Sequence, residues 1–474
     1  MPLLQSLRFA ADIYRQIKAT DKSVKQLKDV QAARLRSLVR HAVGKSDFYR
    51  QKYRGINLQR FELSELPPTN KSEIRDNFES VVTDPRIRLS DLRQFVSDER
   101  NLGKWHLGEY AIAQTSGSQG EPLMIVQHRR AVQLILALMV ARCPARPTYA
   151  EGVKRLFAPR RVVAISFRRG FYSSGTVLEH LQELTGSTSR LIRLSSTQPD
   201  LLERLNDAQP EVIVGNAGVL EGIAIRADRL RLKKLTYLSS SSEQLTAAAR
   251  ARIEEGFNAP VYDHYAAGEC LHLSDTCRTC QGLHVNLDWA ILEVVDENNQ
   301  PVPDGETGTK VLITNLANFA QPFIRYELGD RVALAVDNNC PRNPLPRIER
   351  LEGRATDVLC VGGKDSSQLL SSALFVNVFA DVPAVRDYRV IQREPERLEF
   401  QLVLHDPSAV HSTNVENQLM NVLRKYGILS TIRIDVSYVS EIAPDPRTGK
   451  VRRTINEVGS PDANRLIGST SNAQ

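Results

Sequence analysis

The stretch LTYLSSSSEQLTAAARARIEEGFNAPVYDHYAAGE, residues 235–269, predicts a strand, a helix and a second strand in succession. β-Branched and aromatic residues favour a strand at each end of it. Between the two strands Leu245, Ala249 and Ile253 recur every four residues, as they would on the buried face of a helix. Because a helix between two strands usually connects parallel neighbours, we expect a parallel sheet covered by helices.

The same alternation continues on both sides of this stretch. Apolar runs at residues 161–167 and 211–215 each stand before a turn or a helix. Residues 290–296 and 310–316 then flank a turn rich in Pro and Gly, which indicates a more β-dominated section. Near the N-terminus, residues 24–43 have the apolar spacing of an amphipathic helix.

The chain changes character near its C-terminal end. In RLEFQLVLHD, residues 397–406, apolar and polar side chains alternate as in a strand, and a helical stripe follows. We therefore expect an α/β protein with a large N-terminal domain over residues 1–353 and a small mobile α+β domain over residues 354–474. The large domain should contain mixed and parallel sheets flanked by helices, together with a β-rich subdomain.

Composition favours an ordinary globular protein over a nucleic-acid-binding or membrane protein. The 62 Lys and Arg against 55 Asp and Glu leave a net charge of +7, and the basic residues form small clusters rather than one long run. That excess is weak evidence for nucleic-acid binding, because attraction to anionic small molecules explains it equally well. The longest apolar run, Leu134 to Cys143, is interrupted by Arg142 and is shorter than the about 20 residues of a membrane span. With no secretory signal in residues 1–16, we expect a cytoplasmic location.

Several short motifs contain residue types suited to nucleotide chemistry. TSGSQGEP, residues 115–122, is typical either of a loop whose backbone N–H groups bind phosphate or of a simple turn. The carboxylate of Glu269 could bind Mg²⁺, and Tyr265 could pack beside a base. Asp330 follows a glycine turn, where it could accept a ribose hydroxyl. Lys450 stands on a loop bounded by Pro and Gly, although a solvated lysine is the usual interpretation of that residue type.

A separate cluster, CLHLSDTCRTCQGLH at residues 270–284, has the spacing of a metal site. Cys270, Cys277, Cys280 and His284 are four ligands that suit a tetrahedral structural Zn²⁺, and His272 is a substitute for one of them. The alternative is a group of reduced, buried cysteines.

Taken in this order, the motifs resemble those of the adenylate-forming superfamily, and in particular the phenylacetate–coenzyme A ligase branch and its CapK-like relatives from capsular-polysaccharide gene clusters. The resemblance covers about residues 30–455. It extends to RLRSLVRHAVGKSDFYRQKY and LPPTNKSEIRDNF near the N-terminus and to QPEVIVGNAGVLEGIA, residues 209–224, beside the acyl pocket.

The resemblance implies two half-reactions at one site. A carboxylate attacks the α-phosphate of Mg-ATP and pyrophosphate leaves; coenzyme A or another nucleophile then takes the acyl group from the adenylate. The implied catalytic residues are Lys450, Glu269 (also the Mg²⁺ ligand) and Arg354. The implied nucleotide-binding residues are Thr115, Ser116, Gly117, Ser118, Gly120, Ser241, Ser242, Glu243, Asp263, His264, Tyr265 and Asp330. The implied acyl-pocket residues are Asn216, Ala217, Gly218 and Tyr237, and the domain hinge is Thr356.

Several positions depart from the pattern of the resembled proteins. Glu121 stands where a lysine is common in the phosphate loop, Gly268 where Ser or Thr is usual, and Thr356 where aspartate is usual. Ala266 replaces a glycine, and residues 360–375 differ in the segment that helps to form the thiol surface. These departures touch the coenzyme A side more than the ATP side.

The sequence therefore leads us to expect an acid–coenzyme A ligase. The alternatives are an adenylating enzyme with another acceptor, such as an amine, a sugar hydroxyl or a carrier thiol, and a nucleotide-binding protein that has lost turnover. Expected cofactors are ATP, Mg²⁺, a structural Zn²⁺ and coenzyme A. The partners are a small carboxylic acid and the acyl acceptor, with a homodimer as one assembly considered and no nucleic acid.

Overall fold

The computed structural model describes most of the chain. The described residues are 2–115, 122–145, 148, 150–151, 158–166, 170–185, 189–196, 198, 200–224, 226–341, 343–354, 359–361, 368–370, 375, 378–379, 381–406, 413–425, 432–443 and 451–458.

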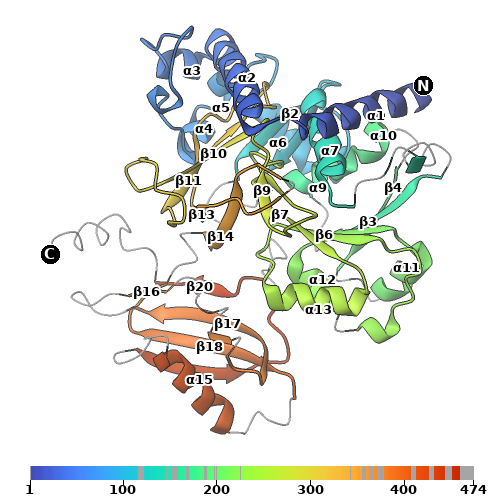
Figure 1. Ribbon diagram of the computed structural model, residues 1–474, viewed down its shortest axis with the longest axis vertical. Coiled ribbons are helices and arrows are strands. Elements are labelled where there is room, and N and C mark those ends of the chain that lie inside the picture. Colours follow the sequence, from blue (N-terminus) through green and yellow to red (C-terminus); the bar gives the residue numbers. More distant parts are fainter. Residues whose placement is uncertain are drawn as a thin grey trace, which may run out of the picture.

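A five-stranded parallel sheet lies at the centre of the larger part of the molecule (Figure 1). Its strands follow the order β4-β3-β5-β6-β7, and each neighbouring pair is parallel. The bounds are β3 (Arg160–Ser166), β4 (Ser189–Ser195), β5 (Val212–Gly215), β6 (Tyr237–Ser241) and β7 (Val261–His264). Strand β4 lies on one side of β3 and strand β5 on the other, so the strand order reverses at β3. A crevice is expected at such a point, at the carboxyl ends of β3 and β5.

Helices cover both faces of this sheet, as the alternating strand and helix patterns predict. Val163 packs in the cluster that contains residues of α11, α12 and α13, whereas its neighbour Val162 packs with α7, α9 and α10 on the opposite face. The bounds are α7 (Arg129–Arg142), α9 (Ser173–Glu179), α10 (Leu181–Thr185), α11 (Leu201–Ala208), α12 (Ala217–Ala224) and α13 (Ala247–Phe257).

Helix α13 begins later than the apolar spacing suggests. The Thr246 side chain accepts a hydrogen bond from the Ala249 N–H group and caps the helix there. Residues 242–246 are therefore a loop, and Ser242 has a positive φ of 72°. This loop brings polar groups to the carboxyl edge of the sheet.

The N-terminal segment forms a series of helices. The predicted helix at residues 24–43 is α2 (Val24–Lys45), capped by Ser23, and Asn70 caps α4 (Lys71–Asp76). Helix α1 (Pro2–Ala19) was not expected from the sequence. The remaining elements before the sheet are α3 (Asp47–Lys52), η1 (Leu63–Glu65), α5 (Phe78–Val81), α6 (Leu89–Ser97), η2 (Glu99–Asn101), β1 (Tyr110–Gln114) and β2 (Met124–His128).

The predicted β-rich section forms two small sheets after β7. One has the order β10-β11-β12 and the other β13-β14-β9-β8. The bounds are β8 (Ser274–Thr276), β9 (Leu283–Val285), β10 (Ala290–Val295), β11 (Lys310–Asn315), β12 (Tyr326–Leu328), β13 (Asp330–Leu334) and β14 (Arg347–Arg354); a short η4 (Ala227–Arg229) precedes β6.

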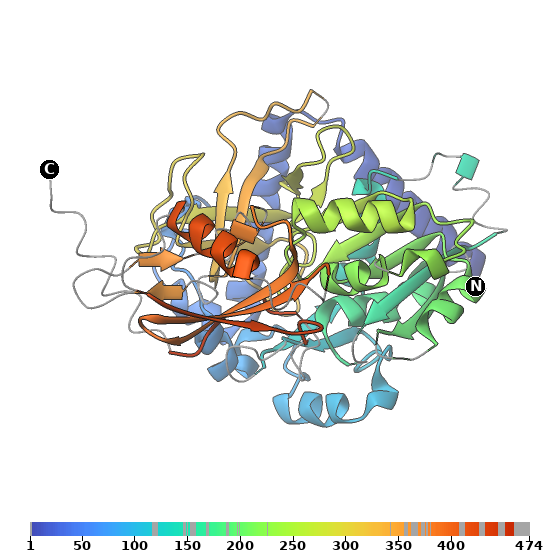
Figure 2. The ribbon, with the colours of Figure 1, turned by 90° about the horizontal axis from the view of Figure 1, so that it is seen from below.

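The C-terminal segment packs around a hydrophobic core of its own. A four-stranded sheet in the order β19-β18-β17-β20 carries helix α15 on one side and lies below the larger part in Figure 1; Figure 2 shows the same arrangement from below. Leu398, Phe400 and Leu402 alternate into this core, as predicted. The bounds are β15 (Leu359–Val361), β16 (Gln368–Leu370), β17 (Val385–Glu394), β18 (Arg397–Leu404), α15 (Thr413–Lys425), β19 (Arg433–Tyr438) and β20 (Thr454–Asn456).

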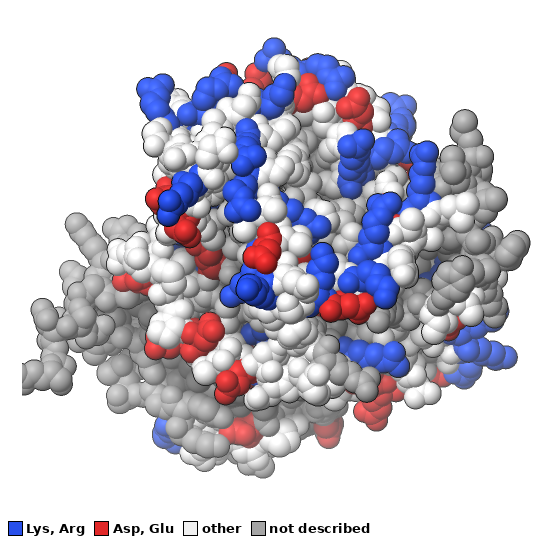
Figure 3. Space-filling model, turned by 45° about the horizontal axis from the view of Figure 1, so that its top comes forward, with Lys and Arg blue, Asp and Glu red and all other residues white. Residues whose placement is uncertain are grey.

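Positive charge is concentrated near the N-terminus rather than spread over the chain. The first 60 residues contain fourteen Lys and Arg but four Asp and no Glu. Their net charge is therefore 14 − 4 = +10, which exceeds the +7 of the whole chain. Figure 3, with the top of Figure 1 brought forward, shows many Lys and Arg side chains on this face with acidic ones among them.

Among the described helices, none combines the length and the apolar character that crossing a bilayer would require.

Candidate functional site

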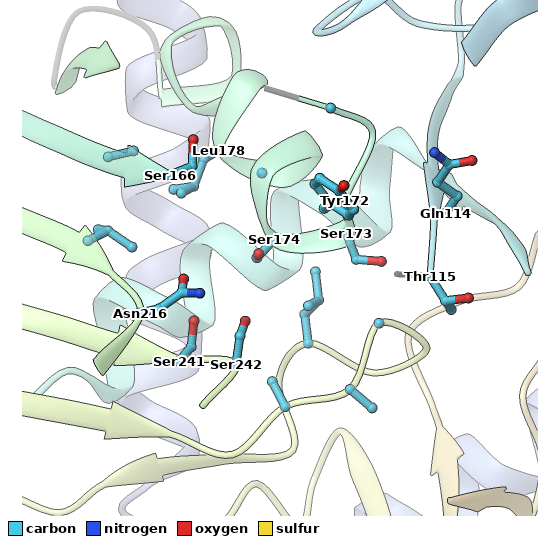
Figure 4. A pocket seen from close by; sticks show the side chains of 18 of the residues that line it. Gln114, Thr115, Ser166, Tyr172, Ser173, Ser174, Leu178, Asn216, Ser241 and Ser242 are labelled. Carbon is cyan, nitrogen blue, oxygen red and sulfur yellow. The ribbon is translucent and has the colours of Figure 1, made fainter. Parts of the chain in front are cut away.

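A cavity of about 540 Å³ opens at the carboxyl edge of the parallel sheet. Its walls come from the ends of β3, β4, β5 and β6, from the end of β1, from helix α9, from residues 266–269 and 271, and from β12 together with the start of β13. This is the edge at which open parallel sheets bind ligands. Figure 4 shows side chains from these elements arranged around the open space.

The cavity brings together predicted residues that are far apart in the sequence. Those that line it are Thr115, Asn216, Ser241, Ser242, Glu269 and Asp330. In Figure 4 Thr115 lies across the open space from Asn216, Ser241 and Ser242. The residues predicted to bind nucleotide therefore surround one space instead of being dispersed over the surface.

The two predicted acidic ligands both border this space. Glu269 is buried at 6% exposure, and its carbonyl oxygen accepts a hydrogen bond from the Asn315 side chain at 2.7 Å. That bond holds the turn which presents the carboxylate. Asp330 begins β13 and accepts a hydrogen bond from the Tyr265 hydroxyl at 2.9 Å.

Tyr265 therefore has a different position from the one that its sequence suggests. It packs in the core cluster and does not border the cavity, so its hydroxyl orients Asp330 rather than its ring meeting a base. Because Asp330 is predicted to accept a ribose hydroxyl of ATP, we expect Tyr265→Phe to raise the KM for ATP about 3- to 10-fold, since a hydrogen bond to a charged acceptor is worth about 1–2 kcal/mol. Steady-state pyrophosphate release measures this effect. An unchanged KM for ATP would show that Asp330 needs no such support.

Asp263 and His264, at the end of β7, lie behind the cavity wall. The His264 ring is 2.7 Å from an Asp275 carboxylate oxygen, and Asn286 donates to the other oxygen of the same carboxylate. Although burial opposes the charge, this carboxylate raises the pKa of His264. Burial also raises the pKa of Asp263 to about 6. Both side chains are engaged within the protein, and neither borders the cavity.

Three of the four predicted acyl-pocket residues do not line the cavity. Asn216 lines it, but Ala217 is 1% exposed inside α12, and Gly218 instead contacts Glu243. Tyr237 stands at the amino end of β6, whereas the cavity lies at the carboxyl end. Four residues of strand separate the two ends by roughly 13 Å. Tyr237 therefore lies outside this cavity, and its place in an acyl pocket stays a prediction.

Glu243 connects the large part of the molecule to the C-terminal segment. Its carboxylate accepts hydrogen bonds from Gly218 N–H at 2.9 Å, from Val451 N–H at 3.1 Å and from the Asn216 side chain at 3.4 Å. Glu243 itself does not border the cavity. Its contacts instead hold residue 451 beside the start of α12.

A second contact joins the same two parts. The Arg453 guanidinium lies 3.2 Å from a Glu221 carboxylate oxygen in α12 and donates to Asp387 of its own sheet at 2.9 Å. Glu221 also accepts from Arg252 in α13. Because Arg453 is largely buried, this ion pair is more than a surface contact.

Some predicted residues lie outside the described part of the chain. They are Ser116, Gly117, Ser118, Gly120, Glu121, Thr356 and Lys450. The backbone of Arg354 pairs with that of Asp330 between β13 and β14, which places this position beside the cavity wall.

The sequence motifs did not indicate the contribution of α9 and β4 to the cavity. Tyr172, Ser173 and Ser174 line it from the start of α9, and Arg193 from β4 forms an ion pair with Glu179 at its border. None of the motifs described above falls on these segments. The short apolar cluster in SRLIRLS, residues 189–195, is a signal that could have indicated β4, although it lacks the strict alternation of a half-buried strand.

A cluster of Cys and His side chains, of the types that bind metal ions, lies away from this cavity. One ligand atom from each of Cys277, Cys280, His284 and Cys340 lies within 4.8 Å of the others. The predicted Cys270 is not part of it: it is fully buried, with its sulfur 3.8 Å from His272 Nε2. Cys340, which follows the cluster by 56 residues in the sequence, takes its place because β9 and β14 are neighbours in one sheet.

The surroundings of these four residues fit a metal ion. His284 directs Nδ1 at the Leu345 carbonyl oxygen, 2.8 Å away, so that Nε2 faces the sulfur of Cys280 at 3.2 Å. The Thr279 N–H group donates to the sulfur of Cys277, which is 3.6 Å from that of Cys340. A histidine oriented through its second nitrogen is the usual arrangement at zinc sites.

The chain is similar to known ligases in sequence. It is 24% identical over 413 residues to a phenylacetate–coenzyme A ligase of Escherichia coli, which covers 84% of this chain and 83% of that protein. It is 22% identical over 384 residues to a phenylacetate–coenzyme A ligase of Pseudomonas putida, covering 77% and 80%. No protein-family model matches the chain.

Solved structures have the same fold. 2-Hydroxyisobutyryl-CoA ligase in the postadenylation state, in complex with R3-HIB-AMP, matches with a TM-score of 0.69 and 18% identity over 95% of this chain and 92% of that one. An open conformation of that ligase, with 2-HIB-AMP and CoA, matches with a TM-score of 0.56 and 19% identity over 90% of both chains. The chain therefore has the fold of the adenylate-forming ligases, and in sequence it resembles the phenylacetate–coenzyme A ligases.

Proposed function

We propose that the chain is a cytoplasmic, ATP-dependent acid–coenzyme A ligase that works through an acyl-adenylate. The observation that carries this proposal is the convergence of Thr115, Asn216, Ser241, Ser242, Glu269 and Asp330 on one cavity. The sequence relatives, both named phenylacetate–coenzyme A ligases, support the same reaction.

The first half-reaction joins two anions, so that charge neutralisation and positioning should dominate catalysis. Glu269 would hold Mg²⁺, which would offset the charge of the phosphates. Asp330, oriented by Tyr265, would accept a ribose hydroxyl. Lys450 would bridge the substrate carboxylate and the α-phosphate. Its neighbour Val451 is held beside α12 by Glu243, and α12 begins directly after the cavity-lining Asn216.

The acyl acceptor defines the two enzymatic versions of this proposal. Coenzyme A is favoured by the relatives, whereas an amine, a sugar hydroxyl or a carrier thiol would serve a related adenylating enzyme. A pyrophosphate-release screen over aryl, fatty and small polar acids, with and without coenzyme A, separates them. Acid-dependent release of pyrophosphate supports adenylation; its absence for every acid would favour a nucleotide-binding protein without turnover.

We also propose that Cys277, Cys280, His284 and Cys340 hold one structural Zn²⁺. Three sulfurs and one imidazole within 4.8 Å form a complete tetrahedral set, and a set with no open position suits a structural rather than a catalytic ion. The ion would tie the loop after β8 to the segment before β14. Its role would be stability, since none of its four ligands borders the larger cavity.

The ion pair between Arg453 and Glu221 should favour the first half-reaction. It joins the C-terminal sheet to α12 in the arrangement that brings residue 451 toward the cavity. We expect Arg453→Met to slow acid-dependent pyrophosphate release about 10-fold, because it leaves Glu221 and Asp387 without this partner. Arg393→Met is the control, since Arg393 forms more exposed ion pairs within the C-terminal segment and should change the rate less than twofold. Equal rates for the two variants would contradict this role.

A further inference from the structure

The hydroxyl of Ser173 is a buried polar group that lacks a partner within the protein. Ser173 is 8% exposed, and its Oγ atom forms no hydrogen bond among the described residues. Among the described residues, several buried side-chain polar atoms form no hydrogen bond. Of these residues, Ser173 is the one that lines the 540 Å³ cavity. In Figure 4 its oxygen is directed toward Thr115, and the atom itself is almost completely covered by the protein.

The surrounding backbone places this hydroxyl at the stem of the glycine-rich loop. Gln114 N–H donates to the Phe171 carbonyl oxygen at 2.6 Å, which ties the end of β1 to the residues just before Ser173. Thr115 in turn exchanges hydrogen bonds with Leu123: its N–H group donates to the carbonyl oxygen at 3.0 Å, and its Oγ1 accepts from the N–H group at 2.9 Å. These contacts close the base of the loop beside Ser173.

On its other side the hydroxyl faces the turn that carries Glu269. A Cβ atom added to Gly268 would lie 2.9 Å from Ser173 Oγ and 3.1 Å from Ile125 Cδ1. The hydroxyl thus occupies the space that a side chain at position 268 would need. A Ser or Thr is expected at that position from the resemblance, whereas this chain has glycine there and a hydroxyl arriving from α9.

A buried hydroxyl without a partner destabilises a protein, because it has lost its hydrogen bonds to water. A ligand that accepts a hydrogen bond from this hydroxyl removes that penalty. The hydroxyl therefore favours binding of such a ligand. Ser173 lies between Thr115, at the base of the glycine-rich segment, and the turn that carries Glu269. If that segment binds phosphate and Glu269 binds Mg²⁺, as proposed above, the acceptor of matching chemistry is a phosphate oxygen. We propose that Ser173 donates a hydrogen bond to a phosphate group of the bound nucleotide. It would do so in place of the Ser or Thr side chain that the resemblance leads us to expect at position 268. This inference rests on the proposed adenylation function.

The first test replaces the hydroxyl without altering the backbone. Ser173→Ala should raise the KM for ATP, or lower kcat/KM for ATP, about 10-fold in acid-dependent pyrophosphate release, while leaving the KM for the acid within twofold. Ser274→Ala is the matched control. Ser274 also has a buried hydroxyl without a partner among the described residues, but it does not border the cavity. It should leave all constants within twofold.

A second variant tests the shared space. In the Ser173→Ala variant, the further substitution Gly268→Ser supplies a hydroxyl from the opposite side. The double variant should have a kcat/KM for ATP at least threefold higher than that of Ser173→Ala alone. Thermal unfolding midpoints of the variants establish that each one is folded.

The outcomes separate this inference from the proposed function. If the unmodified chain releases no pyrophosphate with any acid, the proposed function fails. If it does release pyrophosphate, three results would each overturn the role of Ser173: an unchanged kcat/KM for ATP in Ser173→Ala, an equal loss in Ser274→Ala, or a loss confined to the KM of the acid.

Discussion

Replacing Lys450 with alanine should reduce acid-dependent pyrophosphate release by at least about 10³-fold. The reaction requires a carboxylate to approach an α-phosphate, and a cation between the two anions is the group that lowers this barrier. Loss of one positioned charge at a developing transition state typically reduces turnover about 10²- to 10³-fold, and here the same charge must also hold the nucleophile. Binding of ATP should weaken little, because Asp330, Glu269 and Thr115 remain.

Arg447→Ala is the matched control for this experiment. It removes a positive charge three residues away in the same Pro- and Gly-bounded loop, PDPRTGK, and should keep at least half of the activity. ATP affinity measured by isothermal titration accompanies the kinetic assay. Near-normal pyrophosphate release from Lys450→Ala would remove the basis for assigning an adenylating mechanism to this chain.

Replacing Cys340 with alanine should remove most of the bound zinc and lower the thermal unfolding midpoint on the order of 5–10 °C. Structural zinc contributes about 10–16 kcal/mol in small zinc-binding peptides, and loss of one thiolate of four should forfeit a large part of such a contribution. Metal analysis of purified protein should find about one equivalent of zinc per chain before the substitution, and less than about half an equivalent after it.

Cys270→Ala distinguishes loss of a ligand from loss of packing. Cys270 is more deeply buried than Cys340, so alanine there should also lower the unfolding midpoint, but the zinc content should stay near one equivalent. If Cys270→Ala released the metal while Cys340→Ala retained it, the four-residue site described here would be wrong and the ligand set suggested by the sequence spacing would stand.

The fold could be predicted well from the sequence where periodic patterns are long. The four strands expected at residues 161–167, 211–215, 235–240 and 259–265 are β3, β5, β6 and β7, and their parallel order follows from the helices between them. Strand β4 was missed because its three apolar residues do not alternate and are interrupted by Arg193, at the edge of the sheet. The start of α13 was misjudged because the Thr246 cap, and not the apolar spacing, determines it.

The site could be predicted where short motifs place polar groups at strand ends. Glu269 and Asp330 were predicted in this way, and both line the cavity, whereas their roles toward a nucleotide stay predictions. Cys340 was missed because its proximity to Cys277 depends on how two sheet strands pair 63 residues apart, and spacing in sequence carries no information about that pairing. Ser173 was missed for a similar reason: its role depends on the absence of a side chain at Gly268, which becomes visible once both segments are in place.

The carboxylate of Glu243 has a consequence for anyone who wishes to change which acid the protein accepts. One of its oxygens accepts from the N–H group of Gly218, in the segment predicted to form the acyl pocket, and the other accepts from the N–H group of Val451, next to Lys450. Enlarging or reshaping the pocket near residues 216–218 would therefore shift the anchor of the lysine-bearing segment as well. Engineered variants at these positions should show substrate preference and turnover changing together, so that libraries which also vary Glu243 and residue 451 are the better starting point for altering selectivity.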